Sequence, residues 1–337
     1  MPAIVSYVRE IKGLGSQDLN DAILKSTQPL ILRGLVSSWP MVKAGLSSDQ
    51  DAAMYLQRFY RDANVVAMLG TPEINGRFFY NDDLSGFNFF PVNTNLTAVL
   101  GELYDHRNDE KPPAIYVGST TVDTCFPGFR SENDIDLGAR DPLMSIWIGN
   151  QTRIAAHYDL PDNIACVAAG HRRFTLFPPN QLNNLYIGPL DFTPAGQAIS
   201  LVDFANPDFE KFPRFAQALE HAQVAELEPG DALFLPSMWW HHVEALDRFN
   251  VLLNYWWRQS PEYMDTPTNA LMLALLSVRD LPVEQRQAWK ELFCHYVFDA
   301  DDANLAHIPA QARRVLAPLD ADAARMLRAQ LIKKMNR

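Results

Sequence analysis

Two histidine-containing stretches are the strongest candidates for chemistry in this sequence. Residues 154–163 read IAAHYDLPDN, and further along the chain reads PSMWWHHVEA. A histidine inside an apolar or aromatic run needs hydrogen-bond partners or a metal ion if it is buried. Because residues two apart in a strand point to the same side, His157 and Asp159 could present an imidazole and a carboxylate toward one point. A second histidine from a distant strand, His241 or His242, could complete a three-ligand site.

Two imidazoles and one carboxylate suit ferrous iron when the remaining positions stay open for a cosubstrate and dioxygen. The spacing alone is weak evidence, because 8 histidines and 40 acidic residues in 337 should give about one His-x-Asp/Glu by chance. His242 and Glu244 have the same spacing, and strand parity does not decide between His241 and His242. For each histidine, a hydrogen-bonded place in the core or at the surface is the alternative.

Composition limits the class of protein. The 337 residues are 47% hydrophobic and 20% charged, which is typical of a globular chain. The net charge of −11 argues against a nucleic-acid partner. The three cysteines, Cys125, Cys166 and Cys294, form no CxxC pair, so the sequence favours a reducing, cytoplasmic setting without disulfides or zinc fingers. We also expect no leader peptide at the N-terminus and no membrane span, since no run of 18 apolar residues occurs.

The pattern along the chain predicts three regions. Residues 1–64 read as a mixed α/β region, with Ser16 as the N-cap of a short helix, a buried strand at 29–36 and a helix near 49–61. Residues 65–260 read as a β core, because short β-rich runs are separated by Gly, Pro, Asn and Asp, which favours a barrel or a double-sheet roll. The runs are NVVAML, GRFFYN, AIYVGS, SIWIGN, RRFTLFPP, AELEPGDALFLP and FNVLLNYWW. Residues 261–337 read as three or four helices, the last beginning at Asp320 or Asp322 and ending in basic residues.

The stretch EPGDALFLPSMWWHHV joins a Pro-Gly-Asp turn to an apolar strand and ends in the histidine pair. With HYD, GHRRFTLFPPNQLNNLY, VDFANPDFEKFPRF and NYWW, it resembles the JmjC/cupin-8 group of Fe(II)- and 2-oxoglutarate-dependent oxygenases. Within that group, the chain is most similar to the asparaginyl hydroxylases that act on hypoxia-inducible factor. The resemblance implies a mainly β fold: a double-stranded β-helix (cupin or jelly-roll) core with an N-terminal mixed α/β region and a C-terminal helical region. It also implies a hydroxylase of a protein side chain or another C–H substrate, with Fe(II) as cofactor and 2-oxoglutarate and dioxygen as cosubstrates.

The resemblance assigns His157, Asp159 and His241 as metal ligands, with His242 beside the site or structural. Arg172 falls where these hydroxylases hold a lysine that pairs with the distal carboxylate of 2-oxoglutarate, and a guanidinium can bind a carboxylate with two hydrogen bonds. A surface arginine beside Arg173 is the alternative. The other implied cosubstrate residues are Tyr116, Asn163, Asn254 and Trp256. From the residues alone, Tyr116 reads as a core aromatic, a buried Asn254 needs some polar partner, and Trp256 could simply fill the barrel.

One position departs from the family pattern. The relatives have a threonine three residues before the first ligand, where this chain has Ile154, and Thr152 lies two residues earlier. This departure puts the cosubstrate end of the pocket in question and leaves the metal ligands untouched. We also expect Trp239, Trp240 and Trp256 to form an apolar wall around the site.

The sequence leaves alternatives for the substrate, the type of activity and the oligomeric state. A protein or peptide is the first expectation for the substrate, small molecules and RNA-linked targets stay open, and demethylation is the same chemistry on an N-methyl carbon. The alternatives to an oxygenase are a non-oxidative metal-dependent cupin enzyme and a metal-free cupin binding protein. The apolar helix LMLALL at 271–276 and the family's helical region together predict a homodimer through the C-terminal helices, and packing on the chain's own barrel is the alternative.

Overall fold

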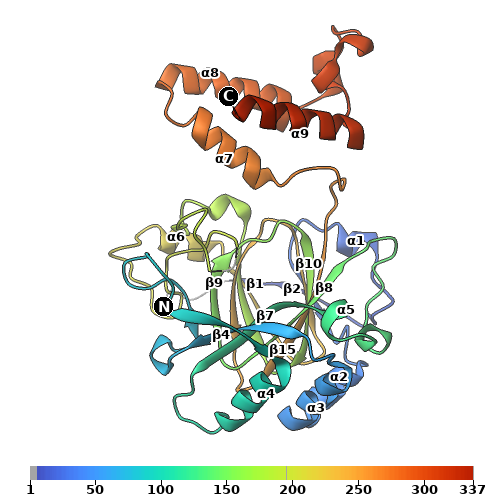
Figure 1. Ribbon diagram of the computed structural model, residues 1–337, viewed down its shortest axis with the longest axis vertical. Helices are drawn as coiled ribbons and strands as arrows, with labels where there is room; N and C mark the ends of the chain where they lie inside the picture. The colour runs from blue at the N-terminus through green and yellow to red at the C-terminus, as the bar shows by residue number, and fades with distance from the viewer. Residues whose placement is uncertain (1–5, 195, 337) are drawn as a thin grey trace. The chain divides into compact units, whose positions relative to one another are not determined.

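The structure is a computed structural model that describes residues 6–194 and 196–336. The first five residues, on which the expectation of no leader peptide partly rests, lie outside this part. Contacts between residues divide the chain into two compact units, Met1–Gln259 and Ser260–Arg337. The first unit contains every strand that the structure describes, and its two sheets form the layered body in Figure 1.

The larger sheet has nine strands in the order β2-β3-β13-β10-β15-β8-β7-β4-β6. Its central strands β13, β10, β15, β8 and β7 are antiparallel to their neighbours within this group, and only β2 and β3 pair in parallel. The strands are β2 (Arg9–Lys12), β3 (Leu30–Arg33), β4 (Asn64–Gly70), β6 (Phe89–Asn95), β7 (Ala114–Thr121), β8 (Leu143–Gly149), β10 (Asp162–Ala169), β13 (Ala232–Leu235) and β15 (Asn250–Trp257).

The smaller sheet has six strands in the order β1-β12-β11-β14-β9-β5. Strands β12, β11, β14 and β9 pair antiparallel, while β1 and β5 add to the two edges in parallel. The strands are β1 (Ser6–Tyr7), β5 (Arg77–Phe78), β9 (Arg153–His157), β11 (Arg172–Phe177), β12 (Gln223–Leu227) and β14 (Trp240–Ala245). Two sheets that face each other with alternating strands of the chain make a double-stranded β-helix, or jelly roll.

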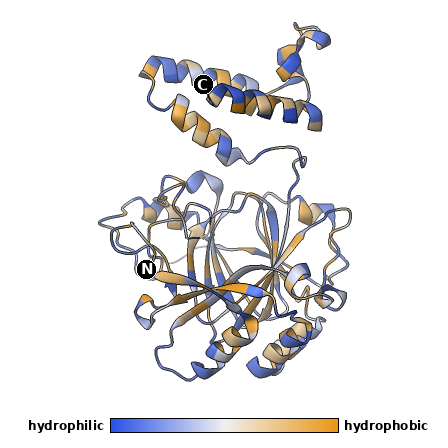
Figure 2. Ribbon diagram, viewed as in Figure 1, coloured by the Kyte–Doolittle hydropathy of each residue, from blue (hydrophilic) through white to orange (hydrophobic). Residues whose placement is uncertain are grey.

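The central strands β13, β10 and β15 of the larger sheet are buried on both faces, which explains their nearly unbroken apolar sequences. One face packs on helices α2 (Pro40–Ser47), α3 (Asp49–Phe59) and α4 (Leu96–Asp105) through a large core that includes Met41, Leu56 and Leu100. The other face meets the smaller sheet through Val167, Leu233 and their neighbours, which pack against Phe174 and Leu176. The strands of the first unit are accordingly mostly apolar in Figure 2. The interior between the sheets is where inward-pointing residues of the strands can meet.

Short helices and turns complete the first unit. Helix α1 (Asp21–Leu24) has Asn20 as its N-cap, whose side chain accepts hydrogen bonds from the amides of Ala22 and Ile23. Helices α5 (Val122–Cys125) and α6 (Phe215–Glu220) lie in the connections β7–β8 and β11–β12. The Pro-Gly-Asp turn connects β12 to β13, and Gly230 there has φ +100°, a conformation that side chains rarely adopt.

The second unit is helical. It contains α7 (Pro267–Ser277), α8 (Val283–Phe293), a π-helical turn at Cys294–Phe298 and α9 (Ala321–Met335), with Asp320 as the N-cap of α9. Not one residue in the range 260–336 is buried. None of the helices described in either unit is both long enough and apolar enough to cross a membrane.

The fold confirms the predicted class, a mainly β jelly-roll core with helices before and after it along the chain. All seven predicted β runs contain strands, although GRFFYN contributes only the two residues of β5. The prediction of Ser16 as an N-cap was wrong, because Ser16 lies in a turn and the helix begins after Asn20. The division at residue 64 within the first unit stays a prediction.

Candidate metal centre

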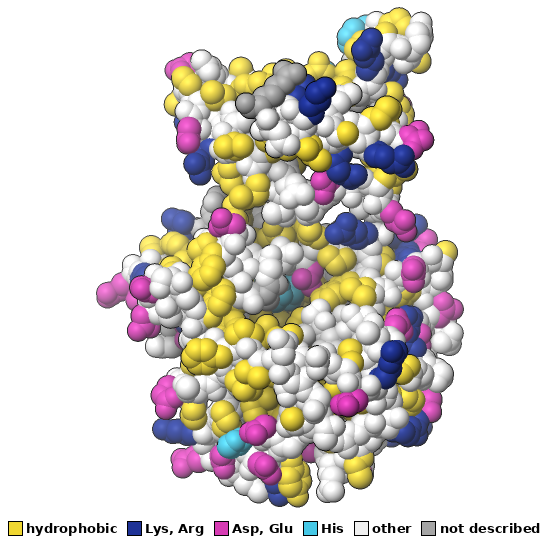
Figure 3. All heavy atoms as spheres, viewed as in Figure 1, with side chains coloured by type: hydrophobic (Ala, Val, Ile, Leu, Met, Phe, Trp, Pro, Cys, Tyr) yellow, Lys and Arg dark blue, Asp and Glu magenta, His cyan; other side chains and the backbone are white. Residues whose placement is uncertain are grey.

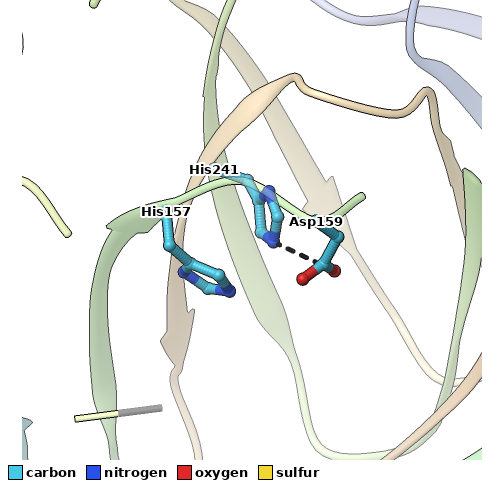
Figure 4. Close-up of side chains that lie close together, drawn as sticks. All are labelled: His157, Asp159 and His241. Carbon is cyan, nitrogen blue, oxygen red and sulfur yellow. Dashed lines mark ion pairs between the residues drawn. The ribbon is translucent and has the colours of Figure 1, made fainter. Parts of the chain in front are cut away.

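Strands β9 and β14 bring the two predicted histidines together. His157 is the last residue of β9 and lies directly opposite His241 of β14, so the two ring centroids are 4.2 Å apart. Asp159 follows two residues after the end of β9, and its Oδ2 is 3.7 Å from Nε2 of His241. One ligand atom from each of the three side chains lies within 4.8 Å of the other two (Figure 4). The arrangement could therefore hold one metal ion.

A β-bulge in β9 gives His157 its inward direction. His157 pairs with His241, but Ile154 pairs with Val243, so β9 has one residue more than β14 over this interval. In a regular strand, residues three apart point to opposite faces. The extra residue lets both Ile154 and His157 line the same cavity, while Arg153 points outward and donates a hydrogen bond to Asp203 at 3.2 Å.

Both imidazoles are oriented by the backbone of their own strand. Nδ1 of His157 lies 3.0 Å from the carbonyl oxygen of Ala155, and Nδ1 of His241 lies 3.0 Å from that of Trp239. A carbonyl oxygen only accepts, so Nδ1 carries the proton in each ring and Nε2 keeps a free lone pair. Burial, together with nearby His157, lowers the pKa of His241 to about 4, although Asp159 acts in the opposite direction. A neutral imidazole of this kind is the form that binds metals.

Asp159 lies in a loop that backbone contacts hold in place. Its carbonyl oxygen accepts a hydrogen bond from the amide of Met238 at 2.9 Å. The hydroxyl of Ser237 donates to the carbonyl of Leu160 at 2.6 Å, and the amide of Ser237 donates to the carboxylate of Asp162 at 2.9 Å. The loop after β9 is thus tied to the β13–β14 turn, which fixes the carboxylate relative to the ring of His241.

The pairing of β9 with β14 decides between the two adjacent histidines. His242 points to the other face of the smaller sheet, where its ring lies 4.6 Å from that of Phe204. Burial, together with the nearby cations Arg153 and Arg77, lowers the pKa of His242 to about 3. Glu244 shares this outer face, 3.9 Å from Arg173. The alternative pair of His242 and Glu244 therefore points away from His157.

The triad opens into a cavity of about 180 Å³ between the two sheets. Figure 3 shows a hollow in the surface of the first unit, with apolar side chains around it. The eight residues that the sequence predicted to bind metal or cosubstrate all line this cavity: His157, Asp159, His241, Tyr116, Asn163, Arg172, Asn254 and Trp256. The structure thus brings the predicted ligands and the predicted cosubstrate residues into one space.

Arg172 points into the cavity and Arg173 points out. Gly170, with φ +70°, turns the chain into β11, where Arg172 is only 2% exposed. No hydrogen bond or ion pair joins the guanidinium of Arg172 to another described residue, and burial lowers its pKa to about 10. The exposed guanidinium of Arg173 instead pairs with Glu226 at 2.9 Å. The surface alternative for Arg172 was therefore wrong, and its buried charge lacks a partner of opposite sign.

The polar and aromatic lining comes from β7, β8, β10 and β15. Asn254 donates to Asn163 at 2.9 Å across β15 and β10. The ring of Tyr116 stacks on Trp147 at 5.7 Å, and Trp147 meets Trp256 edge-on at 5.8 Å. Burial raises the pKa of Tyr116, which keeps its hydroxyl protonated and able to donate, while nearby Arg172 acts in the opposite direction.

Several buried polar atoms of the lining have no hydrogen-bond partner among the described residues. They are Nε of Arg172, Nε1 of Trp147, Oδ1 of Asn254 and Nε1 of Trp256. Buried polar groups are nearly always satisfied in folded proteins, and each unsatisfied one costs about 1–3 kcal/mol. Four such atoms in one cavity indicate that the cavity is built to hold a polar ligand.

Two expectations about the surroundings of the site need correction. Trp239 and Trp240 do not line the cavity, because Trp239 packs in the core between the sheets and Trp240 packs against Tyr158 at 5.0 Å. Thr152 is buried but also lies outside the lining, whereas Ile154 is part of it. The departure from the family pattern at Ile154 therefore stands, with no hydroxyl from this strand in the cavity.

Sequence reasoning missed much of the lining, including three residues whose side chains can form hydrogen bonds: Trp147, Ser119 and Gln197. Trp147 could have been found, because strand alternation places it on the same side of β8 as Ser145, opposite Asn254 of β15. Ser119 faces the cavity because of a register shift in β7, and Gln197 lies in a long connection without regular structure. Neither of the last two positions has a pattern in the sequence that would reveal it.

The fold and the site define a cupin with a candidate metal centre between its sheets, and comparison with known proteins agrees. Residues 16–263 match the family described as a Cupin-like domain (Cupin_8), so this chain belongs to that family. The match covers both sheets except the edge strands β1 and β2, and it ends just after β15.

Relatives in this family have several names. The chain is 29% identical over 185 residues to lysine-specific demethylase JMJ31 of Arabidopsis thaliana, covering 52% of this chain and 32% of the relative. It is 27% identical over 249 residues to lysine-specific demethylase 8 of Xenopus tropicalis, with 72% and 50% covered. It is 25% identical over 282 residues to tRNA wybutosine-synthesizing protein 5 of Mus musculus, with 77% and 80% covered. The matched segments thus span half or less of the two demethylases.

Proposed function

We propose that this protein is an Fe(II)- and 2-oxoglutarate-dependent oxygenase that hydroxylates a C–H bond of a protein side chain or of another small organic group. One observation carries the proposal: a three-ligand site and a buried, unpartnered cation, Arg172, line the same small cavity. A ligand that bridges these two features needs metal-binding oxygens at one end and an anionic group at the other, as 2-oxoglutarate has.

The residues fit the metal. The side chains of His157 and His241 offer Nε2 atoms with free lone pairs, and Asp159 adds one carboxylate oxygen. A set of two histidines and one carboxylate leaves room on the metal for other ligands. When bound, Fe(II) together with 2-oxoglutarate supplies the activation of dioxygen that C–H oxidation requires.

The remaining lining residues hold and orient the cosubstrate in this proposal. The guanidinium of Arg172 and the hydroxyl of Tyr116 donate to its distal carboxylate. The amide pair Asn163–Asn254 lies beside the metal-bound end, and Trp256 packs against the carbon chain. Since Ile154 supplies no hydroxyl, Arg172 and Tyr116 carry the recognition of the distal carboxylate. The rings of Trp147, Trp256 and Tyr116 also exclude water from the site.

The nature of the substrate is part of the proposal. The relatives are named for lysine demethylation and for tRNA wybutosine synthesis, and these activities belong to those proteins. The net charge of −11 favours a polypeptide or small-molecule substrate over a nucleic acid. The narrower likeness to asparaginyl hydroxylases stays a prediction.

Metal and cosubstrate binding test this proposal directly. The purified protein is titrated with Fe(II) without oxygen, then with 2-oxoglutarate, and succinate is measured after oxygen and ascorbate are added. We expect one metal per chain, 2-oxoglutarate binding that requires the metal, and succinate formation. Metal binding without any affinity for 2-oxoglutarate would instead support a non-oxidative cupin enzyme. Absence of metal binding would support a metal-free binding protein.

A further inference from the structure

Strand β9, which carries His157, has little regular pairing on its outer edge. The edge strand β5 consists of only two residues, and it pairs with Arg153 and Ile154 alone. On the other side of β9, the register against β14 shifts between His241 and Val243, within the same short strand. A bulged strand beside a short edge strand can slip in register, and a slip of one residue turns each side chain to the opposite face. The direction of His157 therefore depends on contacts outside the sheet.

A segment of the connection between β11 and α6 supplies such contacts near both ends of β9. Toward the end of the strand, the amide of Ser200 donates a hydrogen bond to the carbonyl of Ala156 at 2.8 Å, one residue before His157. At the start of the strand, Nη1 of Arg153 donates to Oδ1 of Asp203 at 3.2 Å. The segment thus lies along β9 over the interval that contains the bulge.

The carboxylate of Asp203 joins the two strands β5 and β9. Its Oδ2 lies 3.7 Å from Nη1 of Arg77, and its Oδ1 accepts hydrogen bonds from Nη1 of Arg153 and from the amide of Ala205, at 3.2 and 3.0 Å. The side chains of Arg77 and Arg153 are 21% and 19% exposed, and within residues 6–194 and 196–336 no other carboxylate forms an ion pair with either of them. Partly buried charges are less screened by water than exposed ones, so this carboxylate holds the two strands together more firmly than a surface ion pair would.

Asp203 is itself held firmly, because both of its neighbours in sequence are anchored. Val202 is 1% exposed, and the ring of Phe204 packs against those of Phe177 and Phe215 at 5.6 and 4.8 Å. The stretch VDFANPDFEKFPRF, which begins at Val202, contributes no residue to the described lining of the cavity. Its contacts are instead with the strands that carry the metal ligands and with the apolar cluster beside them.

We propose that Asp203 is a positioning residue of the metal centre. Through its two arginine partners it holds the bulged strand β9 in the register that turns His157 toward the other two ligands. This inference rests on the metal site of the proposed function and adds a residue that touches neither the metal nor the cosubstrate. Loss of the carboxylate frees the bulge to move along β9, so that His157 is turned away for part of the time. A ligand that is held less firmly binds the metal more weakly.

Binding of Co(II), a spectroscopic substitute for Fe(II), tests the inference without any turnover. The full chain is titrated with Co(II), and the dissociation constant is recorded together with the visible absorption spectrum, which responds to the number and geometry of the ligands. Asp203→Asn keeps the shape of the side chain and removes its charge, so we expect Co(II) to bind at least about tenfold more weakly, with a spectrum shifted toward that of His157→Ala. Asp203→Glu keeps a carboxylate and should bind Co(II) at least about threefold more tightly than Asp203→Asn does.

The matched control is Glu226→Gln, which removes the charge of an exposed ion pair in the same sheet. Glu226 of β12 pairs with Arg173 of β11 at 2.9 Å, and the two side chains are 56% and 42% exposed. This variant should change the dissociation constant of Co(II) by less than about twofold. An Asp203→Asn variant that binds Co(II) as tightly as Glu226→Gln does overturns the inference.

A double-mutant cycle tests whether Asp203 acts through Arg153. Arg153→Gln should weaken Co(II) binding by at least about threefold in the parent, and by less than about 1.5-fold in a chain that already carries Asp203→Asn. Equal losses in the two backgrounds reject the inference, and so does a variant that is less stable in urea while its Co(II) affinity and spectrum match those of the parent. Should Asp203→Asn fail to fold, Arg153→Gln alone must show the loss of affinity, and unchanged binding by it rejects the inference.

The parent chain separates this inference from the oxygenase proposal. A parent that binds no Co(II) contradicts the metal centre, and the inference falls with it. A parent that binds Co(II), together with unchanged binding in Asp203→Asn, leaves the metal centre intact and removes only the positioning role of Asp203.

Discussion

The two units of this chain bury their side chains in very different ways. In the first unit, a sheet whose central strands are buried on both faces packs on helices on one side and on a second sheet on the other. In the second unit, residues 260–336 include no buried side chain, although α7 carries the apolar run of 271–276. Hydrophobic burial is the main favourable term in folding, so the first unit is stabilised by apolar contacts among its own residues. The described residues of the second unit lack this hydrophobic burial, and we expect the unit to gain it by associating with another chain.

The exposed apolar side chains of the second unit are large. Leu276 is 81% exposed, Phe298 is 75% exposed and Val297 is 60% exposed. Contiguous exposed apolar surface usually marks an interaction site. We propose that a second copy of this chain covers these helices in a homodimer. The proposed chemistry, in contrast, uses residues of the first unit alone.

Loss of one metal ligand should have the largest effect. His157→Ala removes one of three ligands in the first unit, so we expect metal affinity to fall by at least about 100-fold and succinate formation to become undetectable. Anaerobic Fe(II) titration measures the affinity. The matched control is His242→Ala, because His242 is a neighbouring buried histidine that points away from the metal site. Equal loss of affinity in both variants would contradict the assignment of the triad.

A core truncation should come next. Phe234, in β13, is fully buried, and Phe234→Ala should lower the free energy of unfolding by about 3–5 kcal/mol through lost burial and the cavity left behind. Leu276→Ala in α7 should change it by less than about 0.5 kcal/mol, measured at a protein concentration below that needed for association. Urea unfolding followed by tryptophan fluorescence measures both values. Similar losses in the two variants would contradict the contrast between the units.

Removal of the buried cation should affect the cosubstrate and leave the metal bound. Arg172→Leu should weaken 2-oxoglutarate binding to the metal-loaded protein by about 10–100-fold, which corresponds to about 1.4–2.8 kcal/mol, the range for hydrogen bonds to charged groups. Calorimetric titration gives the dissociation constant. Arg173→Leu, which changes the exposed neighbour, should alter it by no more than about twofold. If both variants bind 2-oxoglutarate as the parent does, Arg172 has another role.

Charged substitutions on the exposed helices of the second unit should have the smallest effect on the oxygenase activity. They test directly whether this unit mediates self-association. The double variant Leu276→Asp and Phe298→Asp should weaken self-association by at least about tenfold, since burying an unpaired carboxylate in an apolar interface is unfavourable. Sedimentation equilibrium measures the association. Leu46→Asp, at a leucine of α2 that is 64% exposed in the first unit, serves as the control. A parent chain that is monomeric at all concentrations tested would reject the homodimer.

Much of the first unit could be predicted from sequence because its signals are local. Apolar strands broken by Gly, Pro and Asn revealed the sheets, and the eight site residues predicted from the motifs all belong to the lining of the cavity. The choice between His241 and His242 could not be made, because it depends on which residue of β14 lies opposite His157. The inward direction of Arg172 and the place of Trp240 likewise depend on pairing and packing between distant segments. Ser119 was missed because an irregular register in β7 leaves no periodic pattern.

The extra residue in β9 also bears on how sequences of this kind can diverge. A single-residue deletion between Ile154 and His157 would restore regular alternation and send one of these two side chains to the outer face of the smaller sheet. Substitutions in this interval should alter the shape of the pocket, whereas a deletion that turns His157 outward would remove one ligand of the candidate metal centre. The number of residues here should therefore vary far less among active descendants than their identities do.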